Sequence, residues 1–157
     1  MSDIRRIPVA DLLDYPGFWA ITKKYAEESS IEGMGRCNYD RSQYIALEQG
    51  GALHAIGAYD DHALIGFAVF LVTVIPHYGV RAATTESVFV SQQHRKGRLG
   101  LRLIREMEAW AKELGAVGIF LSSPVDGRLS KLAPRIGYRH TNQVFFKGLK
   151  REPDSDT

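Results

Sequence analysis

Residues 84–104 read TTESVFVSQQHRKGRLGLRLI, and this stretch indicates a β-strand, a basic turn and the start of a long helix. The strand prediction depends on Val88, Phe89 and Val90, because β-branched and aromatic residues in a short apolar run favour a strand. The helix prediction depends on apolar residues that recur at steps of three or four. These residues are Leu99, Leu103, Met107, Ala111 and Leu114.

The turn between the two elements is basic and contains a glycine. Its cationic or titratable residues are His94, Arg95, Lys96 and Arg98. A helix N-terminus presents unpaired backbone N–H groups and the positive end of the helix dipole, so it can hold a phosphate. The same dipole disfavours cations, and so many basic residues there require a compensating partner. We favour an anionic ligand, and a solvated surface turn is the alternative.

The order of residues in this turn matches a known signature. The pattern Val90-x-x-x-x-Arg95-x-x-Arg98-x-Gly100, followed by Leu103, resembles the motif with which the GNAT superfamily of acyl-CoA N-acyltransferases binds the diphosphate of acetyl-CoA. The similarity in the order of elements extends over roughly residues 50–149. Within the family, the chain looks most like small members found in phages and prophages.

Two positions outside the turn bear on the resemblance. Gly137-Tyr138 resembles the Gly-aromatic pair that opens the final hairpin of these domains. Ala133, in contrast, stands where the family usually has a tyrosine that acts as general acid. A tyrosine-dependent protonation step therefore cannot be assigned, and water, Ser122, Ser123 or Tyr138 are the alternatives.

The turn also departs from the family pattern. Arg98 stands where the first motif glycine usually lies, and Gly97 comes one residue early. That glycine normally lets the backbone approach the diphosphate closely. Gly97 could take over its role in a shifted turn, the Arg98 side chain could reach around the phosphate, or coenzyme binding could have been lost.

The resemblance implies that acetyl-CoA is the acyl donor. Its pantetheine would lie along the main chain near Phe89-Val90, and its phosphates on the backbone of residues 96–101. Asp126 stands in the place of an asparagine that often begins the next helix in the family. The predicted coenzyme-binding residues are Phe89, Val90, Arg95, Lys96, Gly97, Arg98, Leu99, Gly100, Leu101 and Asp126.

Glu86 is the predicted general base, because a carboxylate often stands at this point of the family's strand. We expect it to share a strand face with Val88 and Val90. Burying a lone glutamate is costly unless it is paired or functional, so a structural carboxylate or a solvent-facing one is the alternative. His77 and Tyr78, at the end of the preceding strand, are further catalytic candidates for proton relay or substrate contact, with a purely structural role as the alternative.

Composition narrows the classes of protein to which the chain can belong. The chain has 157 residues, of which 45% are hydrophobic and 24% charged, as in a soluble globular domain. We expect one domain over residues 1–149 and a disordered polar tail over residues 150–157. A single cysteine excludes an internal disulfide and gives no metal cluster. There is no signal peptide or membrane-length apolar stretch, so we expect a cytoplasmic protein without a membrane partner.

Periodicity and turn signals predict an α/β fold with a mixed, mainly antiparallel central sheet flanked by helices, and the resemblance implies that this fold is of the GNAT type. Asp40 is the expected N-cap of the helix over residues 41–49. Gly115 is the expected end of the helix over residues 99–114. The predicted strands are residues 4–9, 53–59, 63–75, 80–90, 117–122 and 141–149. The predicted helices are residues 18–28, 41–49, 99–114 and 128–135.

The function that the resemblance implies is transfer of an acetyl group from acetyl-CoA to a primary amine by direct attack. The acceptor could be a small-molecule or peptide amine, and acidic residues near positions 27–40 could attract it or form a solvated face. Three alternatives stay open: a degenerate domain that binds coenzyme or a partner without catalysis, a nucleic-acid module using the basic cluster of residues 95–105, and a homodimer formed through the apolar last strand. A net charge of +2 and the lack of a recognised binding motif argue against the nucleic-acid alternative.

Overall fold

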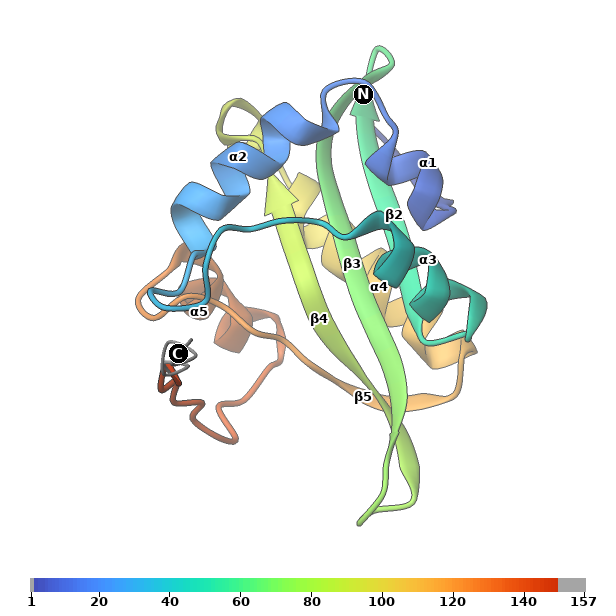
Figure 1. The fold of residues 1–157 in the computed structure, drawn as a ribbon, viewed down its shortest axis with the longest axis vertical. Coiled ribbons are helices and arrows are strands. Elements are labelled where there is room, and N and C mark those ends of the chain that lie inside the picture. The colour runs from blue at the N-terminus through green and yellow to red at the C-terminus, as the bar shows by residue number, and fades with distance from the viewer. Residues whose placement is uncertain (1, 150–157) are drawn as a thin grey trace, which may run out of the picture.

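The computed structural model describes residues 2–149 and has one central sheet (Figure 1). Its strands are β1 (Asp3–Ile7), β2 (Leu53–Asp60), β3 (Ala63–Ile75), β4 (Val80–Val90) and β5 (Ala116–Phe120), in the order β1-β2-β3-β4-β5. Neighbours are antiparallel from β1 to β4, whereas β5 runs parallel to β4. This mixed, mainly antiparallel sheet flanked by helices confirms the predicted fold class.

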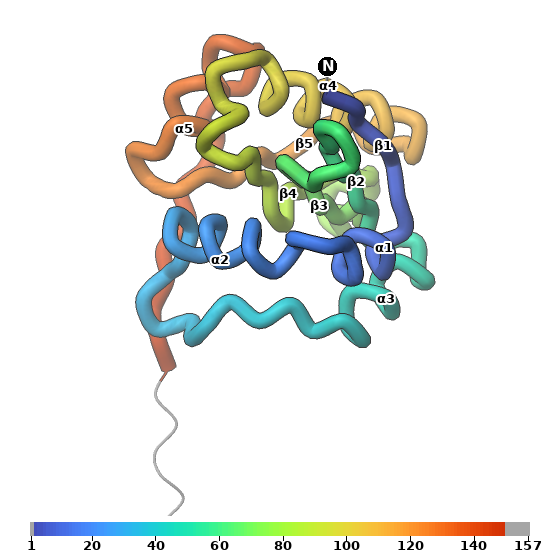
Figure 2. The backbone as a smooth tube through the Cα atoms, turned by 90° about the horizontal axis from the view of Figure 1, so that it is seen from above, coloured from blue at the N-terminus to red at the C-terminus, as the bar shows by residue number. Residues whose placement is uncertain are grey.

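Helices cover both faces of the sheet (Figure 2). On one face lie α1 (Val9–Leu13), α2 (Phe18–Ser29) and α3 (Arg41–Gln49). On the other face lie α4 (Leu99–Glu113), α5 (Arg128–Leu132) and the 3₁₀ turn η2 (Ala133–Ile136). The short 3₁₀ turn η1 (Gln92–His94) connects β4 to α4. Every helix within residues 2–149 is too short or too polar to cross a bilayer.

The sheet separates two hydrophobic cores because alternate side chains of a strand point to opposite faces. On the α2 side, Phe67 of β3 and Phe89 of β4 pack with Phe18 of α2. On the α4 side, the apolar stripe of the helix is buried against the other face of the same strands, as its spacing predicts. The buried stripe residues are Leu99, Leu103, Met107 and Ala111.

Two helix ends follow the sequence predictions. The Asp40 carboxylate accepts hydrogen bonds from the N–H groups of Ser42 and Gln43 at 3.0 and 3.3 Å, which confirms it as the N-cap of α3. Gly115 has a φ of +85° immediately after α4 and donates its N–H to the Lys112 carbonyl. Glycine occupies this left-handed conformation without strain, so Gly115 ends the helix as expected.

β4 and β5 pair over only part of their length. Their register is Arg81↔Ala116, Ala83↔Ile119 and Thr84↔Phe120. Beyond Thr84 the two strands diverge, and the last contact is the hydrogen bond from the Ser122 N–H to the Thr85 hydroxyl at 2.9 Å. The last residues of β4 therefore have no ladder partner on the β5 side among residues 2–149.

The predicted last strand over residues 141–149 is wrong, because this segment has no regular secondary structure. Its aromatic and β-branched residues suggest a strand, but strand propensity reflects packing on a pleated, half-buried surface. Here Val144 is 89% exposed and Phe145 is 86% exposed, so they have no such surface to pack on. The tail over residues 150–157 lies outside the described residues.

Two valines test the difference between a packed strand and the exposed segment over residues 141–149. Val69→Ala should lower the free energy of unfolding by about 2 kcal/mol, because Val69 is 1% exposed in β3 and the substitution leaves a cavity. Val144→Ala should change it by less than about 0.5 kcal/mol, since the side chain is already in water. Urea unfolding followed by circular dichroism measures both. An equal loss in both variants would mean that residues 141–149 form a packed strand.

Candidate active site

The turn between β4 and α4 presents a row of unsatisfied donors. Within residues 2–149, no oxygen accepts a hydrogen bond from the backbone N–H groups of residues 96–101, and Arg98 at the N-cap gives no side-chain cap. A helix start with unpaired N–H groups and a positive dipole end is suited to bind a phosphate. The turn thus offers the kind of donors that an anionic ligand requires.

Gly97 in this turn is open to ligand rather than packed against protein. A Cβ added to Gly97 would meet no heavy atom within 4 Å, and the residue does not have a positive φ. Gly66 in β3 is different, because a Cβ there would lie 2.8 Å from the Phe89 carbonyl oxygen. The fold therefore needs a glycine at position 66 to bring β3 close to the end of β4. It does not need one at position 97.

Arg95 is held by the protein itself. Its Nε donates to the Val90 carbonyl at 2.7 Å, and its Nη2 donates to both carboxylate oxygens of Glu28 at 2.8 Å. The guanidinium lies 5.1 Å from the centroid of the Phe89 ring, and the side chain is only 16% exposed. Arg95 therefore ties the end of β4 to α2, and Glu28 is one compensating partner for the positive charge of the turn.

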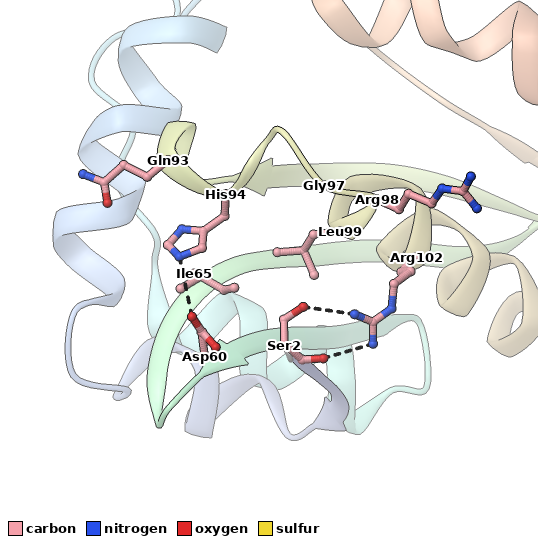
Figure 3. A pocket seen from close by; sticks show the side chains of 9 residues that line it. All are labelled: Ser2, Asp60, Ile65, Gln93, His94, Gly97, Arg98, Leu99 and Arg102. Atoms are coloured by element: carbon pink, nitrogen blue, oxygen red, sulfur yellow. Dashed lines mark hydrogen bonds and ion pairs between the residues drawn. The ribbon is translucent and has the colours of Figure 1, made fainter.

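A cavity of about 490 Å³ lies beside the turn (Figure 3). Arg102 lines it and donates to the hydroxyl and the carbonyl of Ser2, both at 3.0 Å. His94 lines it with Nε2 3.9 Å from an Asp60 carboxylate oxygen. The Arg98 side chain points away from these contacts. In the described part of the chain, no carboxylate forms an ion pair with Lys96, Arg98 or Arg102, and of these three Arg102 alone is held by a hydrogen bond to Ser2.

Glu86 occupies a β-bulge. Val69 of β3 pairs with Ser87 and Phe70 pairs with Thr85, so Glu86 has no partner between them. A bulge changes the alternation of side chains along a strand. Glu86 consequently lies on the α2 and α3 side, and the expectation that it shares a face with Val88 and Val90 is wrong.

Two hydroxyl groups hold the Glu86 carboxylate. The Tyr44 hydroxyl donates to Oε1 and the Ser87 hydroxyl donates to Oε2, each at 2.6 Å. Both bonds orient an exposed side chain, and a carboxylate offers about four acceptor positions. About two positions therefore remain available to a ligand.

Glu86 lines a second cavity, of about 240 Å³, together with tyrosines from three parts of the chain. They are Tyr25 of α2, Tyr39 of the connecting loop and Tyr44 of α3. Burial, followed by the charge of Glu86, raises the pKa of all three phenols above their ordinary value. They remain protonated at neutral pH, so none of them competes with Glu86 as a base.

Sequence reasoning missed these tyrosines. The available signal was the position of Tyr39 and Tyr44 on either side of the N-cap Asp40, close to the acidic residues that could attract an amine. No sequence pattern connects Tyr25 to them. Only the packing of α2 over β4 brings it to the same cavity, where its ring lies 6.1 Å from that of Phe89.

The structure does not bring His77 and Tyr78 to Glu86. Both lie in the β3–β4 turn, where their rings stack at 4.3 Å and Tyr78 is 71% exposed. Val80 and Glu86 are six residues apart on β4, which corresponds to about 20 Å of strand. A proton relay from His77 or Tyr78 to Glu86 has no geometric support.

The remaining predicted residues lie around the divergence of β4 and β5. Asp126 follows β5 in an exposed turn and has a φ of +58°. The Tyr138 hydroxyl donates to a Glu108 carboxylate oxygen at 3.0 Å, and burial together with this bond raises its pKa. Tyr138 is therefore directed at α4 and is a weak candidate for the missing general acid.

The chain is similar to proteins of one family. The family model described as Acetyltransferase (GNAT) family matches residues 17–130. A ribosomal-protein-alanine N-acetyltransferase from Brucella melitensis biovar Abortus 2308 superposes with a TM-score of 0.73 and 23% identity, over 96% of this chain and 100% of that one. No curated protein sequence matches the chain significantly.

Two further solved structures have the same fold. One is an aminoglycoside acetyltransferase from an uncultured soil metagenomic sample in complex with sisomicin, with a TM-score of 0.74, 17% identity and coverage of 95% of this chain and 97% of that one. The other is glucosamine-6-phosphate N-acetyltransferase from Arabidopsis thaliana, with a TM-score of 0.72, 14% identity and coverage of 94% and 97%. At these identities the likeness establishes the fold alone.

Two neighbouring cations of the turn should differ in their effect on stability. Arg95→Ala should lower the free energy of unfolding by about 2 kcal/mol, because it removes three hydrogen bonds and leaves Glu28 unpaired. Lys96→Ala should change it by less than about 0.5 kcal/mol, since that side chain is exposed. Urea unfolding of both variants is the measurement. Equal stability of the two would contradict the structural role of Arg95.

Proposed function

The protein belongs to the GNAT acetyltransferase family, whose acyl donor is acetyl-CoA, and from this premise we propose that it acetylates a primary amine with Glu86 as general base. The observation that carries the proposal is the position of Glu86. Its bulge lies where β4 has lost its partner β5, and its carboxylate lines a cavity on the α2 side. An acyl donor along the strand and an amine in the cavity would both lie next to it.

The chain offers acetyl-CoA two main-chain surfaces. The edge of β4 near Phe89 and Val90 has no strand partner on the β5 side within residues 2–149, and its main-chain groups other than the Val90 carbonyl, which Arg95 occupies, can hydrogen-bond the amide groups of an extended ligand. The N–H groups of residues 96–101, with Lys96, Arg98 and the open position at Gly97, can hold the diphosphate. Acetyl-CoA supplies the thioester carbonyl that the amine attacks. Asp126 is kept as a proposed contact on the β5 side.

Glu86 supplies the proton acceptor. An ammonium must lose a proton before its nitrogen can attack a carbonyl carbon. The hydrogen bonds from Tyr44 and Ser87 fix the carboxylate, so its remaining acceptor positions face the cavity in a defined orientation. The departing thiolate gains a proton from water, or from Ser122 or Ser123 at the end of β5.

The fold does not specify the acceptor amine. The solved structures with this fold are described as acting on a ribosomal protein alanine, on aminoglycosides and on glucosamine-6-phosphate, so the fold does not select among small-molecule and peptide amines. The predicted cytoplasmic location and the resemblance to phage members stay predictions. The basic cluster that motivated the nucleic-acid alternative is partly used internally, because Arg95, Arg102 and Arg105 bind Glu28, Ser2 and Glu108.

Removing the base should reduce turnover without affecting the binding of the acyl donor. Glu86→Gln should lower kcat/KM by about 100-fold, because the amide cannot accept a proton, while acetyl-CoA affinity stays unchanged. Asp11→Asn is the control, since Asp11 is an exposed carboxylate of α1 outside both cavities. The rates of acetylation are measured on a panel of amines by monitoring the release of free thiol. Full activity of Glu86→Gln would exclude Glu86 as the base.

Removing a proposed phosphate ligand should weaken coenzyme binding. Arg98→Ala should raise the Kd for acetyl-CoA by about tenfold, because one charge-assisted contact to the diphosphate is lost. The Kd for 3′-dephospho-CoA should rise by the same factor, since both ligands carry the diphosphate. Calorimetric titration measures both. If the folded wild-type protein bound neither ligand, the turn would have lost its function and the non-catalytic alternative would stand.

We also propose that the protein forms a homodimer, as the apolar residues 141–149 predict. The support is an unpaired edge at β5 with Val117 exposed, and the exposed side chains of Val144 and Phe145. An unpaired strand edge can accept a strand from a second copy. Light scattering at several protein concentrations gives the mass. A monomer throughout would dismiss the dimer.

A further inference from the structure

The cavity next to Glu86 has a chemical character that narrows the acceptor. We propose that it binds a single primary ammonium at the end of a slender alkyl chain, such as the side chain of lysine or a small alkylamine, held between the Glu86 carboxylate and the rings of Tyr25, Tyr39 and Tyr44. This inference rests on the proposed function. The proposed function names a primary amine in general, whereas the inference states which primary amines the cavity accepts and why.

Charge is the first argument. Glu86 brings a negative charge to the cavity, and two hydroxyls rather than a cation hold its carboxylate. Among residues 2–149, no lysine or arginine forms an ion pair with it. A ligand ammonium would therefore be its first cationic partner. Glu86 is the single carboxylate of the cavity lining, which also contains the exposed Arg36, so the lining can neutralise one ammonium and a polyamine would bring further cations without a carboxylate partner.

The Tyr39 hydroxyl is the second argument. Tyr39 is 6% exposed and lines the cavity, and its hydroxyl lies beside the side chains of Ser87 and Cys37 but forms no hydrogen bond of regular geometry among residues 2–149. The nearby Ser87 hydroxyl is directed at Glu86 instead. A buried polar group without a partner is costly and calls for an explanation. The N–H of a ligand ammonium would supply the missing partner, because a neutral phenol oxygen accepts hydrogen bonds.

The aromatic rings are the third argument. Tyr39 packs against Tyr44 with ring centroids 5.4 Å apart and against Phe18 at 5.3 Å, while Tyr25 packs against Phe89 at 6.1 Å. These contacts fix the tyrosine rings before any ligand binds. Tyrosine faces attract cations, and fixed rings lose little freedom on binding. The cavity lining thus combines three fixed tyrosine rings with one carboxylate.

The volume of the cavity is the fourth argument. At about 240 Å³ it is smaller than the pockets of about 300–1,000 Å³ that hold drug-sized ligands. An unbranched alkylammonium fits such a space, whereas a sugar with several rings does not. The rim carries Ile31 and Met34, whose exposed apolar side chains suit the methylene groups of such a chain.

Cys37 provides a test that needs no turnover. It is the only cysteine of the chain, it is exposed, and it lines the same cavity. The full-length protein, without acetyl-CoA, is labelled with 2-aminoethyl methanethiosulfonate, which carries a primary ammonium, and with neutral methyl methanethiosulfonate. Each rate is divided by that of 2-mercaptoethanol, an uncharged thiol. Burial raises the pKa of the Cys37 thiol, and this affects both reagents equally, so it cancels in their ratio.

The cationic reagent should react about tenfold faster than the neutral one relative to the free thiol. Glu86→Gln and Tyr44→Leu should each reduce this preference at least threefold, whereas Glu27→Gln, which removes a carboxylate from the surface of α2, should retain it. Equal rates for both reagents in the wild-type protein would overturn the inference. So would a preference that Glu27→Gln reduces as much as Glu86→Gln does.

A competition measurement does not depend on any variant. Butylammonium should protect Cys37 from the neutral reagent, whereas butan-1-ol and glucosamine at the same concentration should not. Equal protection by butan-1-ol would show that the cavity recognises the alkyl chain alone, and protection by glucosamine would overturn the size argument. Selective labelling without acetylation of butylamine would leave the cation site in place and count against the proposed function. Acetylation of butylamine without selective labelling would support the proposed function and overturn the cation site.

Discussion

The loss of pairing between β4 and β5 beyond Thr84 is the constraint on which the site depends. Up to that residue the strands form a parallel ladder, and after it, within residues 2–149, the main chain of β4 has no strand partner on one side. The Val90 carbonyl on this stretch already accepts a hydrogen bond from Arg95, so a ligand can take the place of a strand at the other main-chain groups. The divergence also directs the chain from Val90 into the turn whose N–H groups precede α4, so the strand edge and the phosphate-binding turn are continuous.

Two local devices adapt β4 to this role. The bulge at Glu86 turns a charged side chain from the α4 face to the face covered by α2 and α3, where Tyr44 receives it. Arg95 then fixes the end of the strand by bonding both the Val90 carbonyl and Glu28 of α2. Gly66 lets β3 approach this end closely. Together they hold the part of the strand that has lost its neighbour β5.

The sequence predicts the elements with strong periodicity and fails where tertiary partners decide. The bounds of α3, β3 and β4 follow from caps and apolar runs that act locally. The face of Glu86 could not be predicted, because a bulge depends on the register with β3. Residues 141–149 have strand propensity but no partner strand, and the tyrosine cavity is assembled from α2, a loop and α3, which only packing brings together.

The hydrogen bond from Tyr44 to Glu86 joins two separate parts of the chain. Residues 84–104 contribute the strand edge, the base and the phosphate turn, whereas residues 25–44 contribute the three rings and the rim of the cavity. Substitutions in the earlier segment can therefore reshape the cavity while the later segment keeps its coenzyme contacts. A gene that must change its acceptor can do so within about twenty codons of the α2–α3 region, as expected for a fold in which loops on a rigid scaffold determine specificity.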